Sequence, residues 1–349
     1  MSIENLVRKN IQALQPYRSA RDDFDSGILL DANENSYGDP FGNHDELNRY
    51  PMPYQEVLRS KIANFRNVGS EHVFVGVGSD EAIDLLIRIF CEPKEDAILI
   101  TPPTYGMYKV SAQVNDVDIQ RVLLTEDFQL LPKETLAATT DHTKIIFLCS
   151  PNNPTANSLN KDDIIKVIEG FRGIVVVDEA YIDFSEQKSF SELVKTYDNL
   201  VVLQTMSKSF GLAGIRLGVA IASTPIIEYM MKIKAPYNVN KLTSKYAIQA
   251  FEELDAIKGR VETIIEERKR IERVLAQMPA IEHVFPSDAN FILFRVADAL
   301  NVYKACAEKG VIVRYRGHEP HCENSLRVTI GTPEENDRFL QVLQEITTN

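Results

Sequence analysis

The segment from Thr205 to Gly218, with the sequence TMSKSFGLAGIRLG, holds a lysine in surroundings suited to covalent chemistry. Lys208 follows a strongly apolar run and stands among small and hydroxyl residues, not in a charged stretch. A lysine in a partly dry site has a lowered pKa and can form a Schiff base with a carbonyl compound. The hydroxyls of Thr205 and Ser207, together with Arg216, are suited to holding a phosphate. The alternative is a strand end that carries an ordinary surface lysine.

An acidic residue stands at the end of a second apolar run, Val175–Val177. Asp178 is expected at the carboxyl end of a buried parallel strand, where open α/β sheets bind their ligands. A carboxylate there can pair with the protonated nitrogen of a pyridine-type ring and make that ring an electron sink. Tyr181, three residues later, can reach a phenolic oxygen on the same ring. The alternative is an acid that caps the next helix.

A glycine-rich stretch, Gly76–Glu81, is expected to form a turn from a strand into a helix. The backbone N–H groups at the start of a helix bind anions, so Gly78, Ser79 and Asp80 are candidate contacts to a phosphate. The pattern resembles a dinucleotide-binding turn only superficially, because the third glycine is missing and an acid opens the helix. Ser79 as a plain helix cap is the alternative, and it is compatible with phosphate binding.

Two more turns follow apolar runs. Ser150–Thr155 contains prolines on both sides of two asparagines, which fix a rigid turn in which the Asn153 amide can donate to a ring oxygen. Pro102–Tyr108 places Tyr105 where its ring can stack on a flat cofactor. A simple turn and ordinary core packing are the respective alternatives.

The elements around these segments decide whether their side chains meet. Short β-rich runs alternate with amphipathic helical stretches, such as Asp80–Phe90 and Lys161–Glu169. This alternation predicts an α/β fold with a mainly parallel sheet that helices cover on both faces. The expected strands are Val73–Val77, Ala97–Thr101, Lys144–Cys149, Gly173–Val177, Asn199–Gln204 and Leu217–Ala222.

The pattern changes near Lys241, where a long charged helical region begins, is broken near Asp255 and ends near Met278. Further strands are expected at Asn290–Val296, Val311–Tyr315 and Leu326–Ile330, with helices near 298–309 and 333–346. We therefore predict an N-terminal arm over residues 1–30, a large domain over 31–239 and a smaller α+β domain over 240–349.

The composition is ordinary for a globular protein, since 44% of the 349 residues are hydrophobic and 25% are charged. The net charge of −12 disfavours nucleic-acid binding, which needs a basic face. Four scattered cysteines without a CxxC spacing favour the cytoplasm. We expect no membrane association, because the N-terminus lacks a signal-peptide core and no apolar run approaches a membrane span. No metal is expected either, because Pro320 would break a metal-binding helix at His318–Cys322.

Taken together, these segments resemble the aspartate aminotransferase superfamily, whose members have the pyridoxal-phosphate fold type I. The resemblance is carried by Asn153 in an N-P-T turn, Asp178 and Tyr181 in D-E-A-Y, Lys208 in S-K-S-F-G, Arg216 eight residues later, and Ser79 and Tyr105. It implies pyridoxal 5'-phosphate as the cofactor, with Lys208, Asp178 and Tyr181 as catalytic residues. Ala156 departs from the pattern, because most relatives have glycine after the N-P-T turn.

A closer resemblance, to the histidinol-phosphate aminotransferases, covers nearly the whole chain. It is carried by Leu30–Gly38 (L-D-A-N-E-N-S-Y-G), Asn48–Pro51 (N-R-Y-P), Pro16-Tyr17 and Leu326–Thr332 (L-R-V-T-I-G-T). The family implies that Tyr50 reaches the cofactor phosphate of the neighbouring subunit, so a homodimer with shared sites is expected.

The implied reaction moves an amino group between L-histidinol phosphate and 2-oxoglutarate by a ping-pong mechanism, giving imidazole acetol phosphate and glutamate in histidine biosynthesis. Arginine forks match both phosphate and carboxylate, so one cluster can hold either substrate. Arg327 and Arg314 are the candidates, with Tyr17 and Asn33 as further substrate contacts. The choice between Arg314 and Arg316 stays open, although a solvated basic face is favoured for Arg316.

Several alternatives share the same signals. A phosphothreonine decarboxylase would have every cofactor residue in common, and an aromatic or branched-chain aminotransferase would lack the preference for phosphate. A non-catalytic ligand sensor could lose one of the key residues, yet Lys208, Asp178 and Arg216 are all present. A nicotinamide dehydrogenase is the least favoured, because the third glycine of its turn is missing.

Overall fold

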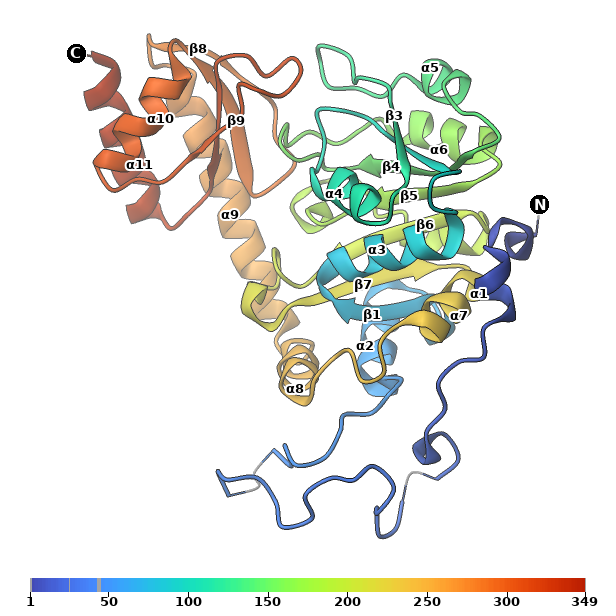
Figure 1. Ribbon diagram of the computed structural model, residues 1–349. Coiled ribbons are helices and arrows are strands. Elements are labelled where there is room, and N and C mark those ends of the chain that lie inside the picture. The colour runs from blue at the N-terminus through green and yellow to red at the C-terminus, as the bar shows by residue number, and fades with distance from the viewer. Residues whose placement is uncertain (1, 25, 43–44, 349) are drawn as a thin grey trace.

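The computed structural model describes residues 2–24, 26–42 and 45–348, so Met1 and Asp25 of the expected arm lie outside the described residues. The described chain contains a seven-stranded sheet and a separate four-stranded sheet. Figure 1 shows that the long helix α9 (Leu254–Leu275) runs from the side of the large sheet to the small one. The two sheets therefore belong to two bodies that this helix joins.

The large sheet has the strand order β1-β7-β6-β5-β4-β2-β3. Strand β7 is antiparallel to both of its neighbours, and the other pairings are parallel. The bounds are β1 (Val73–Val77), β2 (Ala97–Ile100), β3 (Asp118–Arg121), β4 (Thr143–Cys149), β5 (Ile174–Asp178), β6 (Leu200–Thr205) and β7 (Leu217–Ala222). The predicted mainly parallel sheet is confirmed, and β3 is an additional edge strand that the sequence did not indicate.

Helices cover both faces of this sheet, which explains why its strands are apolar throughout. The helix bounds are α1 (Lys9–Ala13), α2 (Glu56–Arg66), α3 (Gly78–Phe90), α4 (Met107–Val114), α5 (Pro132–Ala137), α6 (Lys161–Gly170), α7 (Thr224–Ile233) and α8 (Lys241–Ala250). In β5, Val175 and Val177 pack into one core with α2 and α6, whereas Ile174 and Val176 pack into a second core with α3, α4 and α7.

The small sheet has the order β10-β11-β9-β8 and is antiparallel throughout. Its strands are β8 (Ile281–Val284), β9 (Phe291–Val296), β10 (Arg314–Tyr315) and β11 (Ser325–Thr329), and it packs with α9, α10 (Ala299–Glu308) and α11 (Pro333–Thr348). The expected α+β character is confirmed, as is the break in the long helical region, because α8 ends at Ala250 and α9 begins at Leu254. Strand β10 is shorter than predicted, and β8 was not predicted.

The N-terminal segment between α1 and α2 loops away from the large sheet (Figure 1). Among the residues described in this segment, the backbone forms one short 3-10 turn, Ala20–Asp22, before α2 begins at Glu56. Many of its large apolar side chains are exposed: Tyr17, Phe24, Ile28, Leu30, Tyr37, Phe41 and Met52. Many exposed apolar side chains in one segment of a chain are typical of an interaction surface. Within the described part of the chain, no helix combines the length and the apolar character that crossing a membrane requires.

Candidate active site

The segments singled out in the sequence meet at one cavity of about 400 Å³. It lies at the carboxyl ends of β1, β2, β4, β5 and β6, and the antiparallel β7 begins at the same edge. The small sheet closes the cavity with arginines from β10, β11 and the residue after β10. The lining residues are Ser79, Asp80, Tyr105, Cys149, Asn153, Asp178, Ala180, Tyr181, Thr205, Ser207, Lys208, Arg216, Arg314, Arg316 and Arg327.

Lys208 lies in the turn after β6, and its Nζ stands 5.4 Å from the centre of the Tyr181 ring. Burial lowers the pKa of the Lys208 ammonium, and the positive charge of Arg327 lowers it further. A lowered pKa increases the fraction of neutral amine, which is the form that attacks a carbonyl carbon. In this position Lys208 can act as a nucleophile and a base.

Asp178 is the last residue of β5 and is fully enclosed, with 3% of its surface exposed. Its two carboxylate oxygens accept hydrogen bonds from different donors, the Tyr108 hydroxyl at 2.7 Å and the Ala180 N–H at 3.1 Å. Burial raises the pKa of Asp178 to about 6, although the hydrogen bond from Tyr108 opposes the rise. A cationic N–H group beside Asp178 in the cavity would offset the free-energy cost of ionising its buried carboxyl group.

The sequence reasoning missed Tyr108. Its side chain is fully buried in α4, and its ring stacks on Phe147 with the centroids 4.7 Å apart. Tyr105 instead faces the cavity, where its hydroxyl donates to Asp80 at 3.1 Å. The helical spacing of three residues between the two tyrosines was the available signal, because it places both on one side of the helix start.

Tyr108→Phe should lower turnover at pH 7 roughly tenfold, since Asp178 loses a charge-assisted hydrogen bond worth about 1.5–3 kcal/mol. The pKa of Asp178 then rises further above about 6, so the acid limb of the pH–rate profile should move to higher pH. The measurement is kcat between pH 5.5 and 8.5. Tyr197→Phe is the matched control, because Tyr197 donates to Glu169 at the surface. If Tyr108→Phe had the parental pH profile, Tyr108 would not contribute to keeping Asp178 ionised.

The opposite end of the cavity is built for an anion. Gly78 begins α3 with φ at +71°, and its N–H donates to the carbonyl of Arg216 at 2.9 Å. A Cβ on Gly218 would come within 2.1 Å of the Gly78 backbone, so glycine is required where β7 passes the helix start. The Arg216 guanidinium lies 3.6 Å from the Asp80 carboxylate. The start of α3 and the Arg216 side chain thus line the same end of the cavity, where N–H groups of a helix start can bind an anion.

Hydroxyl groups complete this end of the cavity. The Thr205 hydroxyl donates to Ser207 Oγ at 3.0 Å and accepts from the Ser207 N–H at 3.1 Å. Ser79, in the first turn of α3, also lines the cavity. The expected phosphate-binding residues are therefore close to one another, and their donors match a phosphate group.

Asn153 connects the two domains across the cavity. Its side-chain oxygen accepts a hydrogen bond from Nη1 of Arg327, whose guanidinium lies 5.1 Å from the centre of the Phe291 ring. Only the amide oxygen can accept from a guanidinium, so the amide NH2 of Asn153 is left to donate into the cavity. Ala156, which stands where relatives have glycine, has φ at +71° and is buried.

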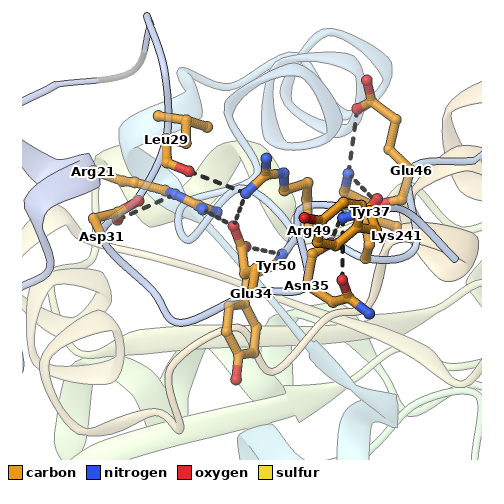
Figure 2. Close-up of polar contacts among 11 residues, drawn as sticks. Arg21, Leu29, Asp31, Glu34, Asn35, Tyr37, Glu46, Arg49, Tyr50 and Lys241 are labelled. Carbon is orange, nitrogen blue, oxygen red and sulfur yellow. Dashed lines mark hydrogen bonds and ion pairs between the residues drawn. The ribbon is translucent and has the colours of Figure 1, made fainter.

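Three expected site residues lie away from this cavity, in the N-terminal segment. Figure 2 shows Glu34 between Arg21 and Arg49, with distances of 2.6 and 2.8 Å, and the N–H of Tyr50 donates to the same carboxylate at 2.6 Å. Burial opposes ionisation of Glu34, but these hydrogen bonds prevail and lower its pKa to about 2. The Tyr50 ring is half-exposed and stacks on Tyr237 with centroids 4.8 Å apart. The network fixes the backbone that carries Tyr50.

Tyr17 and Asn33 also stay outside the cavity. Tyr17 is 69% exposed and lies beside Tyr54 and Tyr237, and Asn33 is exposed with φ at +56°. Arg316, for which the sequence favoured a solvated face, instead lines the cavity with part of its guanidinium buried. Among the described residues, no group of three or more His, Cys, Asp and Glu side chains is placed to hold a metal ion.

Comparisons with known proteins agree with this geometry. The family model of class I and II aminotransferases matches residues 24–343. The histidinol-phosphate aminotransferase of Flavobacterium johnsoniae is 49% identical over 347 residues, which are 98% of each chain. The structure of the histidinol-phosphate aminotransferase of Clostridium acetobutylicum superposes with a TM-score of 0.80 at 26% identity, covering 87% of this chain and 92% of that one.

A second solved structure, the histidinol-phosphate aminotransferase of Sinorhizobium meliloti in complex with pyridoxal-5'-phosphate, gives a TM-score of 0.80 at 20% identity. It covers 91% of this chain and 90% of that one, and it shows the shared fold. The fold is the pyridoxal-phosphate transferase fold type I that the sequence predicted. The chain belongs to the class I and II aminotransferase family and, within it, to the histidinol-phosphate aminotransferases.

Proposed function

We propose that this protein is a pyridoxal-phosphate enzyme that transfers the amino group between L-histidinol phosphate and 2-oxoglutarate, giving imidazole acetol phosphate and glutamate. The observation that carries the proposal is one cavity in which Lys208, Asp178 and Arg216 face three arginines of the small domain. The name of the 49% identical relative from Flavobacterium johnsoniae supports the same substrate. It favours this reaction over phosphothreonine decarboxylation and over the transamination of aromatic amino acids.

The cavity fits pyridoxal phosphate in charge and in donor type. When bound, this cofactor supplies an aldehyde that condenses with amines and a ring that accepts electrons. The start of α3 with Gly78, Ser79 and Asp80 would hold the phosphate together with Thr205, Ser207 and Arg216. Asp178 would hold the ring nitrogen protonated, which matches a carboxylate whose ionisation is costly without a cation.

The remaining cavity residues have separate tasks. Lys208, with its lowered pKa, would bond the cofactor and then move the proton at the reacting carbon of the substrate. The amide NH2 of Asn153 and the hydroxyl of Tyr181 would donate to the oxygen on the ring. The ring of Tyr105 would lie against the face of the cofactor.

The two substrates share a need for a cationic pocket. Histidinol phosphate carries a phosphate and no carboxylate, whereas glutamate carries two carboxylates. Arg327 and Arg314 stand opposite each other on neighbouring strands at the cavity wall, where their forks can hold either anion. This arrangement supports a ping-pong reaction in which both substrates use one site.

The test is a half-reaction measurement with the purified protein and pyridoxal phosphate. L-Histidinol phosphate should convert the bound cofactor to its amine form, and 2-oxoglutarate should restore it with release of glutamate. Release of carbon dioxide from phosphothreonine would indicate the decarboxylase instead. Equal rates with histidinol phosphate, phenylalanine and tyrosine would indicate an aromatic aminotransferase, and no turnover of any of these would overturn the proposal.

We also propose a homodimer with shared active sites. The exposed apolar side chains between residues 14 and 55 need a partner surface, and a second copy of the chain satisfies that need by symmetry. The Glu34 network would then hold Tyr50 in place to reach the cofactor phosphate of the neighbouring subunit. Tyr17 and Asn33 would reach the neighbour's substrate from the same segment.

Mixing Tyr50→Ala and Lys208→Ala proteins should restore activity that neither has alone. In a heterodimer, one site combines the intact lysine of one subunit with the intact tyrosine of the other. Random exchange should therefore recover about one quarter of the parental activity. The control is a mixture of two different Lys208 variants, which has no intact site in any combination. Exchange shown by mass-tagged subunits without recovery of activity would contradict the shared site.

We place the enzyme in the cytoplasm, where biosynthesis of histidine would supply its substrates. The support is that Cys91, Cys149, Cys306 and Cys322 are all free and buried, as in a reducing compartment. We also propose that the chain is divided into an arm over residues 1–30, a large domain over 31–239 and a small domain over 240–349.

A further inference from the structure

Three arginines lie on one face of the small sheet. Arg314 in β10 is directly opposite Arg327 in β11, and the pairing continues to Arg316, whose N–H donates to the carbonyl of Ser325 at 2.9 Å. Directly opposed residues of a sheet share a face, and so do residues two apart on a strand. All three side chains accordingly line the same cavity.

This arrangement is unfavourable for a protein without a bound anion, because like charges opposite each other destabilise a sheet. Elsewhere in the described chain the arginines often pair with carboxylates, but no such ion pair involves Arg314, Arg316 or Arg327. Burial lowers the pKa of Arg316, and the charge of Arg314 lowers it further. The cluster therefore concentrates unbalanced positive charge in a chain whose net charge is −12.

The three arginines differ in their hydrogen bonds and in their exposure to solvent. Arg327 already donates to Asn153, and Arg314 is solvent-exposed. Arg316 is half-buried, and its Nε is buried without a hydrogen-bond partner. A buried donor without an acceptor costs free energy, so its persistence here indicates a site completed by a ligand.

We infer that Arg316 is a specificity residue that binds the phosphate of the phosphorylated substrate and contributes little to binding the dicarboxylate substrate. The inference rests on the proposed function and deepens it, because it assigns to a third arginine the discrimination between the two anions.

The reason lies in the different charge and shape of those anions. A phosphate monoester carries up to two charges and presents three strongly accepting oxygens. A carboxylate carries one charge and two oxygens, which one or two arginine forks saturate. The third guanidinium therefore adds a contact for the phosphate and finds no free oxygen on a carboxylate.

The test compares Arg316→Met with the parent in both half-reactions, each with bound pyridoxal phosphate. The KM for L-histidinol phosphate should rise roughly 10- to 100-fold, as expected for a lost charge-assisted hydrogen bond. The kcat should stay near the parental value, and the KM for glutamate should change less than about threefold. L-Histidinol without phosphate should react poorly and equally with both proteins. Arg316→Lys, which keeps the charge but loses the fork, should give an intermediate KM for histidinol phosphate.

The control variant is Arg338→Met, which removes one positive charge from the exposed side of α11 in the same domain. It should leave both KM values unchanged. Thermal unfolding of the substrate-free protein distinguishes a loss of binding from a loss of folding. Arg316→Met should raise Tm by about 2 °C, because it relieves the repulsion among the three arginines. A parental KM for histidinol phosphate, or equal losses with both substrates, would overturn the role of Arg316. Absence of turnover of histidinol phosphate by the parent would instead contradict the proposed function itself.

Discussion

Lys208→Ala should lower turnover by roughly 10⁴-fold, the upper range for a positioned group that transfers protons. Lys208 provides the only lysine Nζ among the side chains that line the described cavity, so no neighbouring residue can replace the lost amine. The cofactor should still bind, because the proposed phosphate contacts at Gly78, Ser79 and Arg216 do not involve this side chain. The measurement is single-turnover transfer from L-histidinol phosphate.

Two controls make this prediction specific. Lys166→Ala removes a surface lysine paired with Asp163 and should leave turnover unchanged. Added methylamine should partly restore Lys208→Ala, increasingly so as pH rises, because only the neutral amine accepts a proton. Borohydride reduction of the parent should leave a pyridoxyl group on Lys208, and a label on another lysine would show that the assignment is wrong.

The parts of the fold that could be predicted from the sequence are those that the core determines. The strands β4, β5 and β6 are buried on both faces, so their runs are continuously apolar and easily recognised. The candidate residues follow those runs directly, which is why Asn153, Asp178 and Lys208 were expected at one edge of a sheet. The structure brings them together in one cavity.

The missed elements lack that signal. Strand β3 (Asp118–Arg121) and strand β8 (Ile281–Val284) lie at sheet edges and contain mostly exposed or half-exposed residues. These two strands form because they pair with a neighbouring strand, and their own sequences carry little strand pattern. Tyr108 was missed because its function depends on a contact with Asp178, 70 residues away in the sequence.

The arginines show a different limit. Sequence alternation predicts that Arg314 and Arg316 share a face, but not whether that face meets solvent or the large domain. The answer depends on how α9 and the small sheet are placed against the strand ends, which is a matter of tertiary packing. The position of Tyr50 is a similar case, because its expected partner belongs to another subunit.

Asp178→Asn should have opposite effects on catalysis and on the stability of the cofactor-free protein. Turnover should fall roughly 10²- to 10³-fold, as for other losses of a charge that stabilises the transition state. Binding of histidinol phosphate should change little, since its proposed phosphate contacts are the small-domain arginines and not Asp178. The measurement is kcat and KM in each half-reaction, and nearly parental turnover would contradict the role of Asp178.

The effect on stability follows from the pKa of Asp178, which burial raises to about 6 from an unfolded value of 3.8. Between these values the folded apoprotein binds more protons than the unfolded chain, so this group stabilises the fold below pH 4 and loses that contribution as pH rises through 6. A shift of about two units corresponds to about 3 kcal/mol. Asparagine avoids this cost, because its oxygen can accept from the Ala180 N–H while its NH2 donates to the Tyr108 oxygen. In urea unfolding of the apoprotein, the free energy of unfolding of Asp178→Asn relative to that of the parent should therefore increase between pH 4 and 7. With pyridoxal phosphate bound, the parent should be more stable than Asp178→Asn, because the cationic ring nitrogen then compensates the charge of the parental carboxylate. A stability difference between the two apoproteins that does not depend on pH would contradict this effect of Asp178.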